Sequence, residues 1–441
     1  MLSKKDIFIQ RTFFALFWVI GCFGFIYQEI IPPLELLFTP MNLLADGVIL
    51  MLGLLTLRKK IHILMISIFF AATFVSSCFV NNMGLVQWAN GTRSFFGILF
   101  LIPVFHHFWS TPTRHRHFIT ALDKHLFIWL CVQPFCVVYQ FLRYGAGDQV
   151  GGSFGDGGSS IVSFGIYFAS FYLLNKRLDQ TQVFKSIRDN IWLVILLFPT
   201  FLNETKVSFI LLLMYFFLLF PINRSYIKRV LVISPVVLLL TGGAIWVYIE
   251  TVDRSDDMLN PKFLMEEYLY SDYSVEELAG AMEWVAENEN QLPDIPRFAK
   301  IGFIPYIIDE NGGHWMEGLG LQGFSGSVSL GENKLVSEYN WFFIGTNPYV
   351  CYIIIQIGII GVIWTLIFYY QMFFFCPPGY QKNKNIHIFA ILCFIILLFY
   401  ADMVKTLFFS FLYFLFCFLQ WKPEETTQDN GTRLELLANS L

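Results

Sequence analysis

A glycine-rich stretch headed by an arginine is the first part of this sequence that could do chemistry. Residues 143–160 read RYGAGDQVGGSFGDGGSS, and seven of these eighteen residues are glycine. Arginine offers a planar fork that suits a phosphate, and a glycine-rich backbone can turn its N–H groups around an anion. A helix starting in GSSIVSF would add its positive end. We expect Arg143, Gly151, Gly152 and Gly155 to form a pyrophosphate cradle, with a flexible loop as the alternative.

Two further cations belong to the same expected site. Lys206 lies in PTFLNETKVSF, a polar break in an apolar stretch, and Arg93 precedes another apolar run. A tight NETK turn would bring Glu204 and Lys206 to the membrane face, where the two could also simply pair with each other. We expect Lys206 to bind an anion beside Arg143, with Arg93 as a third positive group.

The polar residues around position 340 could contact a substrate that carries a hydroxyl group. Glu338, Asn340 and Asn347 lie just before or at the start of an apolar run. A base placed there could help to deprotonate an attacking hydroxyl. His314 and Glu204 are weaker choices for this role, because a lone loop histidine is more often merely solvated.

The sequence indicates no metal, cofactor or nucleic-acid site. Its eight cysteines lie almost entirely in apolar runs and contain no CxxC pair, so they read as small packing residues. The chain has neither a DxD-type ligand cluster nor a basic stripe or tail.

The elements that must position these residues are membrane helices. The chain of 441 residues is 56% hydrophobic and only 14% charged, with a mean hydropathy of +0.58. Soluble domains carry roughly 25% charged residues. A helix needs about 20 apolar residues to cross a bilayer. This length criterion predicts an all-α, polytopic membrane bundle of about twelve helices. The expected spans are 12–31, 38–57, 61–80, 94–110, 126–142, 160–175, 190–203, 207–222, 230–249, 347–370, 386–402 and 406–420.

The distribution of basic residues fits alternating spans with both termini in the cytoplasm. Twenty Lys and Arg then fall inside and nine outside, and five of those nine lie in one long loop. Cytoplasmic loops are enriched in Lys and Arg, and outer loops usually lack them. The basic residues in the short outer loops therefore need an explanation: Arg93, Arg143, Lys206 and Lys405. Headgroup contact or snorkelling is the alternative to a binding role for each.

The chain divides into four regions. Residues 1–249 form the first part of the bundle, 250–345 the large outer loop, 346–420 the second part of the bundle and 421–441 a cytoplasmic tail. The loop holds eighteen acidic and five basic residues. NPKFLMEEYLY and SVEELAGAMEWVAENEN carry helix-start signals, so we expect short helices packed over the outer face.

Asp46 is an acid inside an expected span. Intramembrane carboxylates often mark ion or proton paths, which keeps a transporter open as a hypothesis. The absence of repeated halves in the sequence and the long acidic loop argue against it.

Residues 345–361, GTNPYVCYIIIQIGIIG, resemble a segment of the O-antigen ligase and polymerase family. After a long outer loop that family carries His-Asn-x-Tyr-Leu, apolar residues, an acid or amide, and Gly-x-x-Gly. The matching positions here are Asn347, Tyr349, Gln356, Gly358 and Gly361. Thr346 stands where ligases have histidine. The NETK turn resembles the family's Thr-x-Ser-Arg turn with Lys206 in the arginine position, and the glycine stretch resembles its Gly-rich outer segment.

The resemblance implies a GT-C-like membrane fold and metal-independent transfer of a glycan from undecaprenyl pyrophosphate, at the periplasmic face of the bacterial inner membrane. In this chain Thr346 stands in place of the ligase histidine. This difference favours a polymerase that joins lipid-linked repeat units over a ligase that uses lipid A–core. Thr346, Tyr349 and Asn340 would then contact substrate. The partners implied are the lipid-linked glycan, the bilayer and, as a candidate, a chain-length regulator protein. A ligase and a lipid-linked oligosaccharide flippase are the alternatives.

Overall fold

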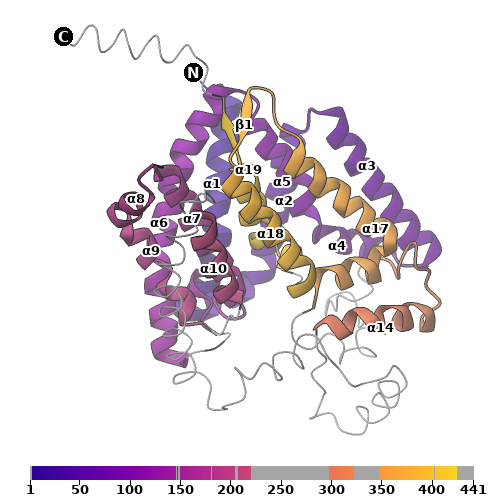
Figure 1. Cartoon of the computed structure of the whole chain (residues 1–441). Helices are drawn as coiled ribbons and strands as arrows, with labels where there is room; N and C mark the ends of the chain where they lie inside the picture. Colours follow the sequence, from indigo (N-terminus) through magenta and orange to yellow (C-terminus); the bar gives the residue numbers. More distant parts are fainter. Residues whose placement is uncertain are drawn as a thin grey trace.

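The computed structural model describes residues 2–145, 147, 149–179, 181–203, 207–219, 297–321, 347–401 and 403–424. This part of the chain is mostly helical, as expected for an all-α protein (Figure 1). Five of its helical segments are long and apolar enough to cross a membrane: Lys4–Ile30, Phe38–Thr56, Lys60–Val80, Pro112–Tyr144 and Tyr349–Phe374.

The long segments correspond to helices α1 (Lys4–Phe25, continued by the π-helical turn η1, Ile26–Ile30), α2 (Phe38–Thr56), α3 (Lys60–Phe74, continued by η3, Val75–Val80), α6 (Pro112–Tyr144) and α17 (Tyr349–Phe374). Between and beside them lie α4 (Leu85–Arg93), α5 (Phe96–Phe108), α7 (Ser159–Arg177), α8 (Val183–Asp189), α9 (Ile191–Ile195), η5 (Phe198–Phe201), α10 (Val207–Leu219), α14 (Arg297–Glu310), α18 (Lys384–Tyr400), η6 (Met403–Lys405) and α19 (Leu407–Phe418).

Most of the expected spans coincide with helix, although some of these helices are short. Phe96–Phe108, Ile191–Phe201, Val207–Leu219, Lys384–Tyr400 and Leu407–Phe418 are apolar but have fewer than eighteen residues. The ninth expected span, 230–249, lies outside the described residues. The number of twelve spans therefore stays a prediction.

The centre of the bundle is formed by α7 and α19, which are buried nearly all round. In α19 every residue from Phe408 to Phe418 is buried. A helix that is apolar on all sides needs neighbours on all sides, and aromatic rings provide them here. Phe13 stacks on Phe411 at 4.5 Å and Phe168 on Phe416 at 4.6 Å between ring centroids. The peripheral helices expose large apolar side chains instead, such as Phe135 at 78% and Leu142 at 79%.

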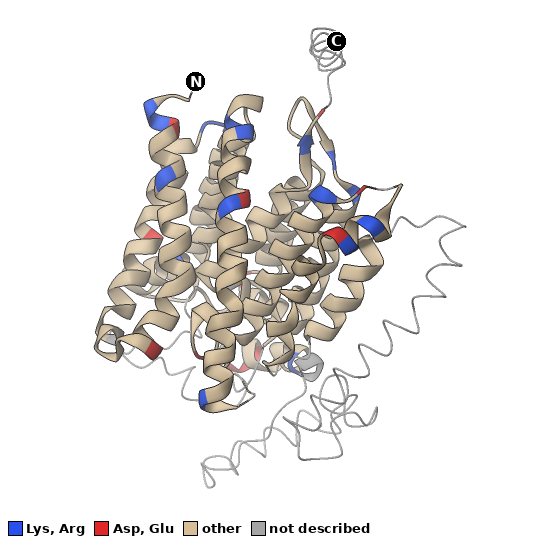
Figure 2. Cartoon of the chain, turned by 90° about the vertical axis from the view of Figure 1, so that its left-hand side faces the viewer, with Lys and Arg blue, Asp and Glu red and all other residues tan. Residues whose placement is uncertain are grey.

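Lys and Arg gather at the end of the bundle that carries the N-terminus (Figure 2). The short hairpin of β1 (Tyr380–Lys382) and β2 (Trp421–Pro423) lies at this end too (Figure 1). It is held there by the Trp109 indole, which donates to the backbone oxygen of Trp421 at 3.0 Å. We call this the basic end. Arg93 and Arg143 lie in the last turns of α4 and α6, and α6 runs away from the basic end.

Part of the long loop is described and docks on a break in α17. Gly358, with φ of 67°, interrupts this helix. The backbone N–H groups of Ile359 and Ile360 donate to the oxygens of Trp315 and Met316, at 2.9 and 3.2 Å, and Leu319 donates to Ile355 at 2.7 Å. The turn at 314–321 thereby satisfies polar groups that the break would otherwise leave unpaired. The helices expected near 260 and 274 lie outside the described residues.

Candidate functional site

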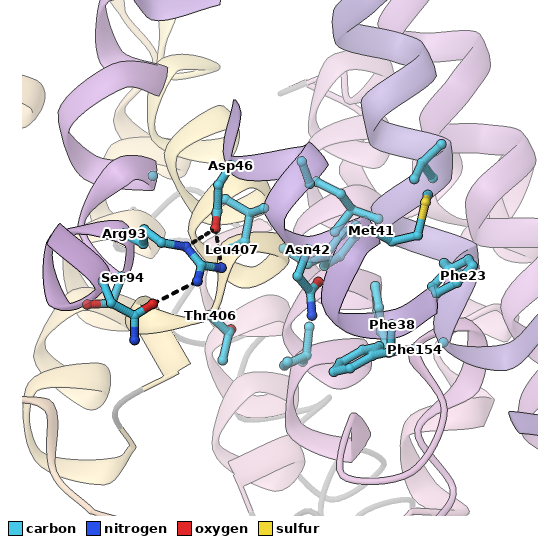
Figure 3. A pocket seen from close by; sticks show the side chains of 18 of the residues that line it. Phe23, Phe38, Met41, Asn42, Asp46, Arg93, Ser94, Phe154, Thr406 and Leu407 are labelled. Carbon is cyan, nitrogen blue, oxygen red and sulfur yellow. Dashed lines mark hydrogen bonds and ion pairs between the residues drawn. The ribbon is translucent and has the colours of Figure 1, made fainter. Parts of the chain in front are cut away.

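A cavity of about 530 Å³ opens among the helices toward the end opposite the basic end. Its walls come from the second half of α1, the first half of α2, the 90–97 segment and the starts of α17 and α19. The apolar side chains include Phe23, Phe38, Met41 and Leu407, and the polar ones gather around Arg93 (Figure 3). The cavity thus combines an apolar wall with one charged corner.

Arg93 and Asp46 form the charged corner. Nε and Nη2 of Arg93 both lie against Oδ2 of Asp46, at 2.8 and 2.7 Å, and Nη1 donates to Oδ1 of Asn90 at 2.8 Å (Figure 3). The Arg93 side chain keeps 31% of its surface exposed and that of Asp46 keeps 12%. Arg93 is therefore held in place while nearly a third of its side-chain surface stays exposed.

Local sequence explains why these two residues meet. On α2 the buried positions include Ala45, Asp46, Ile49 and Gly53, which follow a helical spacing. Asp46 thus shares the inward face of α2. Gly53 lets that face press against α5, because a Cβ there would come within 2.5 Å of Phe100. Arg93 lies in the last turn of α4, where a cation also interacts favourably with the helix dipole.

Asn347 reaches the same cavity from the start of α17. It is 7% exposed and lines the wall. Its Oδ1 accepts a hydrogen bond of 3.1 Å from Nζ of Lys300, which projects from α14 of the long loop. Tyr349 is buried behind this wall, where its ring stacks on Tyr352 at 6.2 Å. Tyr352 lines the cavity, and its hydroxyl donates to Ser94 at 2.8 Å.

The glycine-rich segment folds back into the bundle, and several of its amides are already bonded. The N–H of Gly152 donates to Oε1 of Gln140 at 2.7 Å, and that of Ser153 to Oε1 of Gln133 at 3.1 Å. The N–H of Asp156 donates to Oε1 of Gln28 at 2.5 Å. Three glutamine side chains thus occupy amides that an anion cradle would have used.

The glycines of this segment are needed for close packing. Gly151, Gly152 and Gly155 are all buried. A Cβ on Gly155, with φ of 79°, would lie 1.8 Å from Oε1 of Gln28, and one on Gly24 of α1 would lie 1.9 Å from the backbone oxygen of Phe154. The segment therefore contributes Phe154 as a wall of the cavity, with its ring 4.0 Å from that of Phe408.

Arg143 lies away from the charged corner. Its Nη1 pairs with Oε2 of Glu29 at 2.8 Å, and the Tyr144 hydroxyl donates to the same oxygen at 3.1 Å. The Glu29 side chain is 3% exposed and that of Arg143 is 50% exposed. A separate hollow of about 250 Å³ lies here, lined among others by Glu29 and Asp156. Arg143 is not among the described residues that line the large cavity.

The other expected site residues fall in two groups. Lys206, Glu204, Glu338, Asn340 and Thr346 lie outside the described residues, so the expected proximity of Arg143 and Lys206 stays a prediction. His314 is described and belongs to the turn that docks on α17, where its backbone oxygen accepts from Gly318 at 2.7 Å. It is not among the described residues that line the cavity.

Sequence reasoning missed the way these groups pair. Asp46 was considered for ion passage and Arg93 as a third cation, but not as partners. Lys300 and the three glutamines were not singled out at all. A usable signal existed, since Gln28, Gln133 and Gln140 are polar residues in apolar helices, and buried polar groups find hydrogen-bond partners. No group of three or more metal-binding side chains occurs among the described residues.

Comparison of the chain with family models, with curated proteins and with solved structures finds no match.

Proposed function

We propose that the protein polymerises oligosaccharide repeat units carried on undecaprenyl pyrophosphate, at the periplasmic face of a bacterial inner membrane. The observation that carries this proposal is the cavity itself. One wall is apolar and suits an isoprenoid chain, while the guanidinium of Arg93, the carboxylate of Asp46 and the amide of Asn347 line the same cavity. The cavity is lined by the half of α1 that lies away from the basic end, which fits an outer face under the positive-inside rule.

The residues of the corner have complementary roles in this reaction. The hydroxyl of the acceptor sugar attacks the anomeric carbon of the donor, and the bond from that carbon to the pyrophosphate oxygen breaks. Arg93 stabilises the negative charge that develops on the departing pyrophosphate. Asp46, the carboxylate of the described cavity wall, accepts the hydroxyl proton. Asn347 offers hydrogen bonds that orient the reacting groups.

The apolar wall accounts for the lipid part of the donor. Phe23, Phe38 and Met41 line the side formed by α1 and α2, both of which are candidate membrane-spanning helices. An isoprenoid chain placed between such helices would leave its pyrophosphate near the polar corner. The described part of the long loop docks on α17, and we expect residues of this loop to contribute to the choice of sugar.

Surface glycans of cells that carry the Arg93→Ala variant test the proposal. The expected result is a single repeat unit on the surface in place of long chains, with normal amounts of the protein in the membrane. Arg116→Ala is the matched control, because Arg116 is an exposed arginine at the basic end. Full-length chains left on the lipid carrier would instead indicate a ligase, and complete loss of the repeat unit from the surface would indicate a flippase.

A further inference from the structure

We propose that Lys300, on the long loop, is a positioning residue that fixes the orientation of the Asn347 amide, so that Asn347 presents N–H donors to the cavity. This inference rests on the proposed function, because it concerns the same site. It assigns a role to a residue of the long loop and predicts which chemical groups the cavity accepts.

The contact is buried and reaches from the loop into the bundle. Lys300 is 1% exposed and donates to Oδ1 of Asn347 at 3.1 Å. The helix that carries Lys300 is anchored by its own apolar face, since Ile304, Ile307 and Ile308 are 1%, 0% and 0% exposed. Figure 1 shows α14 beside the start of α17. A buried ammonium on an anchored helix has little freedom to move away from Asn347.

The chemistry of the two groups decides which way the amide points. A lysine ammonium can only donate hydrogen bonds, whereas an asparagine carboxamide has an accepting oxygen on one side and a donating NH₂ on the other. With Lys300 on the oxygen, the NH₂ group is what Asn347 can offer to a molecule in the cavity it lines. A turned amide would place two donors against each other and lose that hydrogen bond.

This orientation sets the character of the polar corner. Arg93 is also a donor without accepting capacity. Donors from Arg93 and Asn347 suit phosphate oxygens and the lone pairs of sugar hydroxyls. The cavity is therefore expected to prefer an isoprenoid that ends in a diphosphate over the corresponding alcohol.

The Asn347→Asp variant tests the inference with little change in shape. A carboxylate would pair with Lys300 but offer no N–H group, and it would repel an anion. The probe is farnesyl diphosphate, titrated into the full chain in lipid nanodiscs, with farnesol as the neutral comparison. We expect Asn347→Asp to weaken farnesyl diphosphate binding by about tenfold or more, the scale of a lost charge-assisted hydrogen bond. Farnesol binding should be maintained, and thermal stability should not fall.

The Lys300→Met variant frees the amide to turn. We expect it to weaken farnesyl diphosphate binding about threefold to tenfold. Wild-type affinity in either folded variant would overturn the inference while leaving the proposed function intact. If the wild-type protein binds farnesyl diphosphate no better than farnesol, the proposed function is what fails.

A stability measurement tests the contact without any ligand. Asn347→Asp should raise the melting temperature when Lys300 is present, because it creates an ion pair, and lower it in the Lys300→Met background, because it leaves a buried carboxylate. The same shift in both backgrounds would show that the two side chains are not coupled and would overturn the inference by itself.

Discussion

Arg93 and Arg143 lie toward the same end of the bundle, and each holds a carboxylate. Arg93 contacts Asp46 at 2.7 Å and Arg143 contacts Glu29 at 2.8 Å. The two pairs differ in what surrounds them. Arg93 lines the large cavity together with its partner, whereas Arg143 is half exposed over a nearly buried Glu29 and lies beside a smaller hollow.

The difference is that two arginines, each paired with a carboxylate, have different surroundings. The positive-inside rule flags both arginines as exceptions and cannot distinguish them. Their surroundings do so. A guanidinium that keeps exposed surface inside a concave, partly apolar site can bind an anion, while one that covers a buried carboxylate mainly keeps that carboxylate paired.

The largest expected effect comes from removing the pair in the cavity. The double variant Arg93→Ala/Asp46→Asn carries no unpaired charge, so the protein should remain folded and abundant. Glycan transfer should nevertheless fall by about 100-fold or more, the range found when a group that stabilises a transition-state charge is removed. The loss of transfer can be measured as polymer length in cells and as the transfer rate of the purified protein. Near-normal transfer would show that the Arg93–Asp46 pair is no more important for the reaction than the Arg143–Glu29 pair, and would contradict the comparison.

A single change in the pair should separate its two members. Asp46→Asn keeps an oxygen that can accept from Arg93 but removes the carboxylate that accepts the proton. Turnover should fall by about 100-fold, whereas binding of farnesyl diphosphate should be retained or become tighter. A parallel loss of binding and turnover would mean that Asp46 acts only by holding Arg93.

The glycine-rich segment offers a test of packing against binding. At Gly155 the backbone φ is 79° and an added Cβ would clash with Gln28. At Gly157 the backbone φ is 71°, but an added Cβ would have no neighbouring atom within 4 Å. Backbone strain of this kind costs about 1–3 kcal/mol, and Gly155→Ala adds a steric clash to it. The protein should therefore lose clearly more thermal stability with Gly155→Ala than with the matched Gly157→Ala. Equal stability, with loss of diphosphate binding in Gly155→Ala, would restore the anion cradle.

The smallest effect is expected at Arg143. Arg143→Ala should lower stability because Glu29 is nearly buried, and the double variant Arg143→Ala/Glu29→Gln should recover it. In that double variant, transfer per folded protein should stay within about threefold of wild type, since Arg143 is not among the described residues that line the large cavity. A loss comparable to that of the Arg93 variant would place Arg143 in the reaction.

The sequence predicted the helical, apolar character of the described chain, and it predicted the contacts between helices poorly. Helix positions follow from the length of apolar runs, and the places of Arg93, Arg143 and Asn347 near helix ends follow with them. Pairing does not follow, because a helix in lipid can be apolar on every side and then carries no signal for the face it turns inward. The contacts between Arg93 and Asp46 and between Lys300 and Asn347 each span 47 residues of sequence. Gln28, Gln133 and Gln140 show the same limit, since their partners are backbone amides that any residue could supply.

The break in α17 at Gly358 has a consequence for protein engineering. The turn at 314–321 supplies hydrogen-bond partners to the broken helix, so loop and helix are complementary at the level of the backbone. Grafting the long loop onto another scaffold, to transplant a sugar preference, would leave both parts with unmatched polar groups if the splice fell between the turn and the helix. A functional chimera should therefore carry residues 297–374 as one cassette.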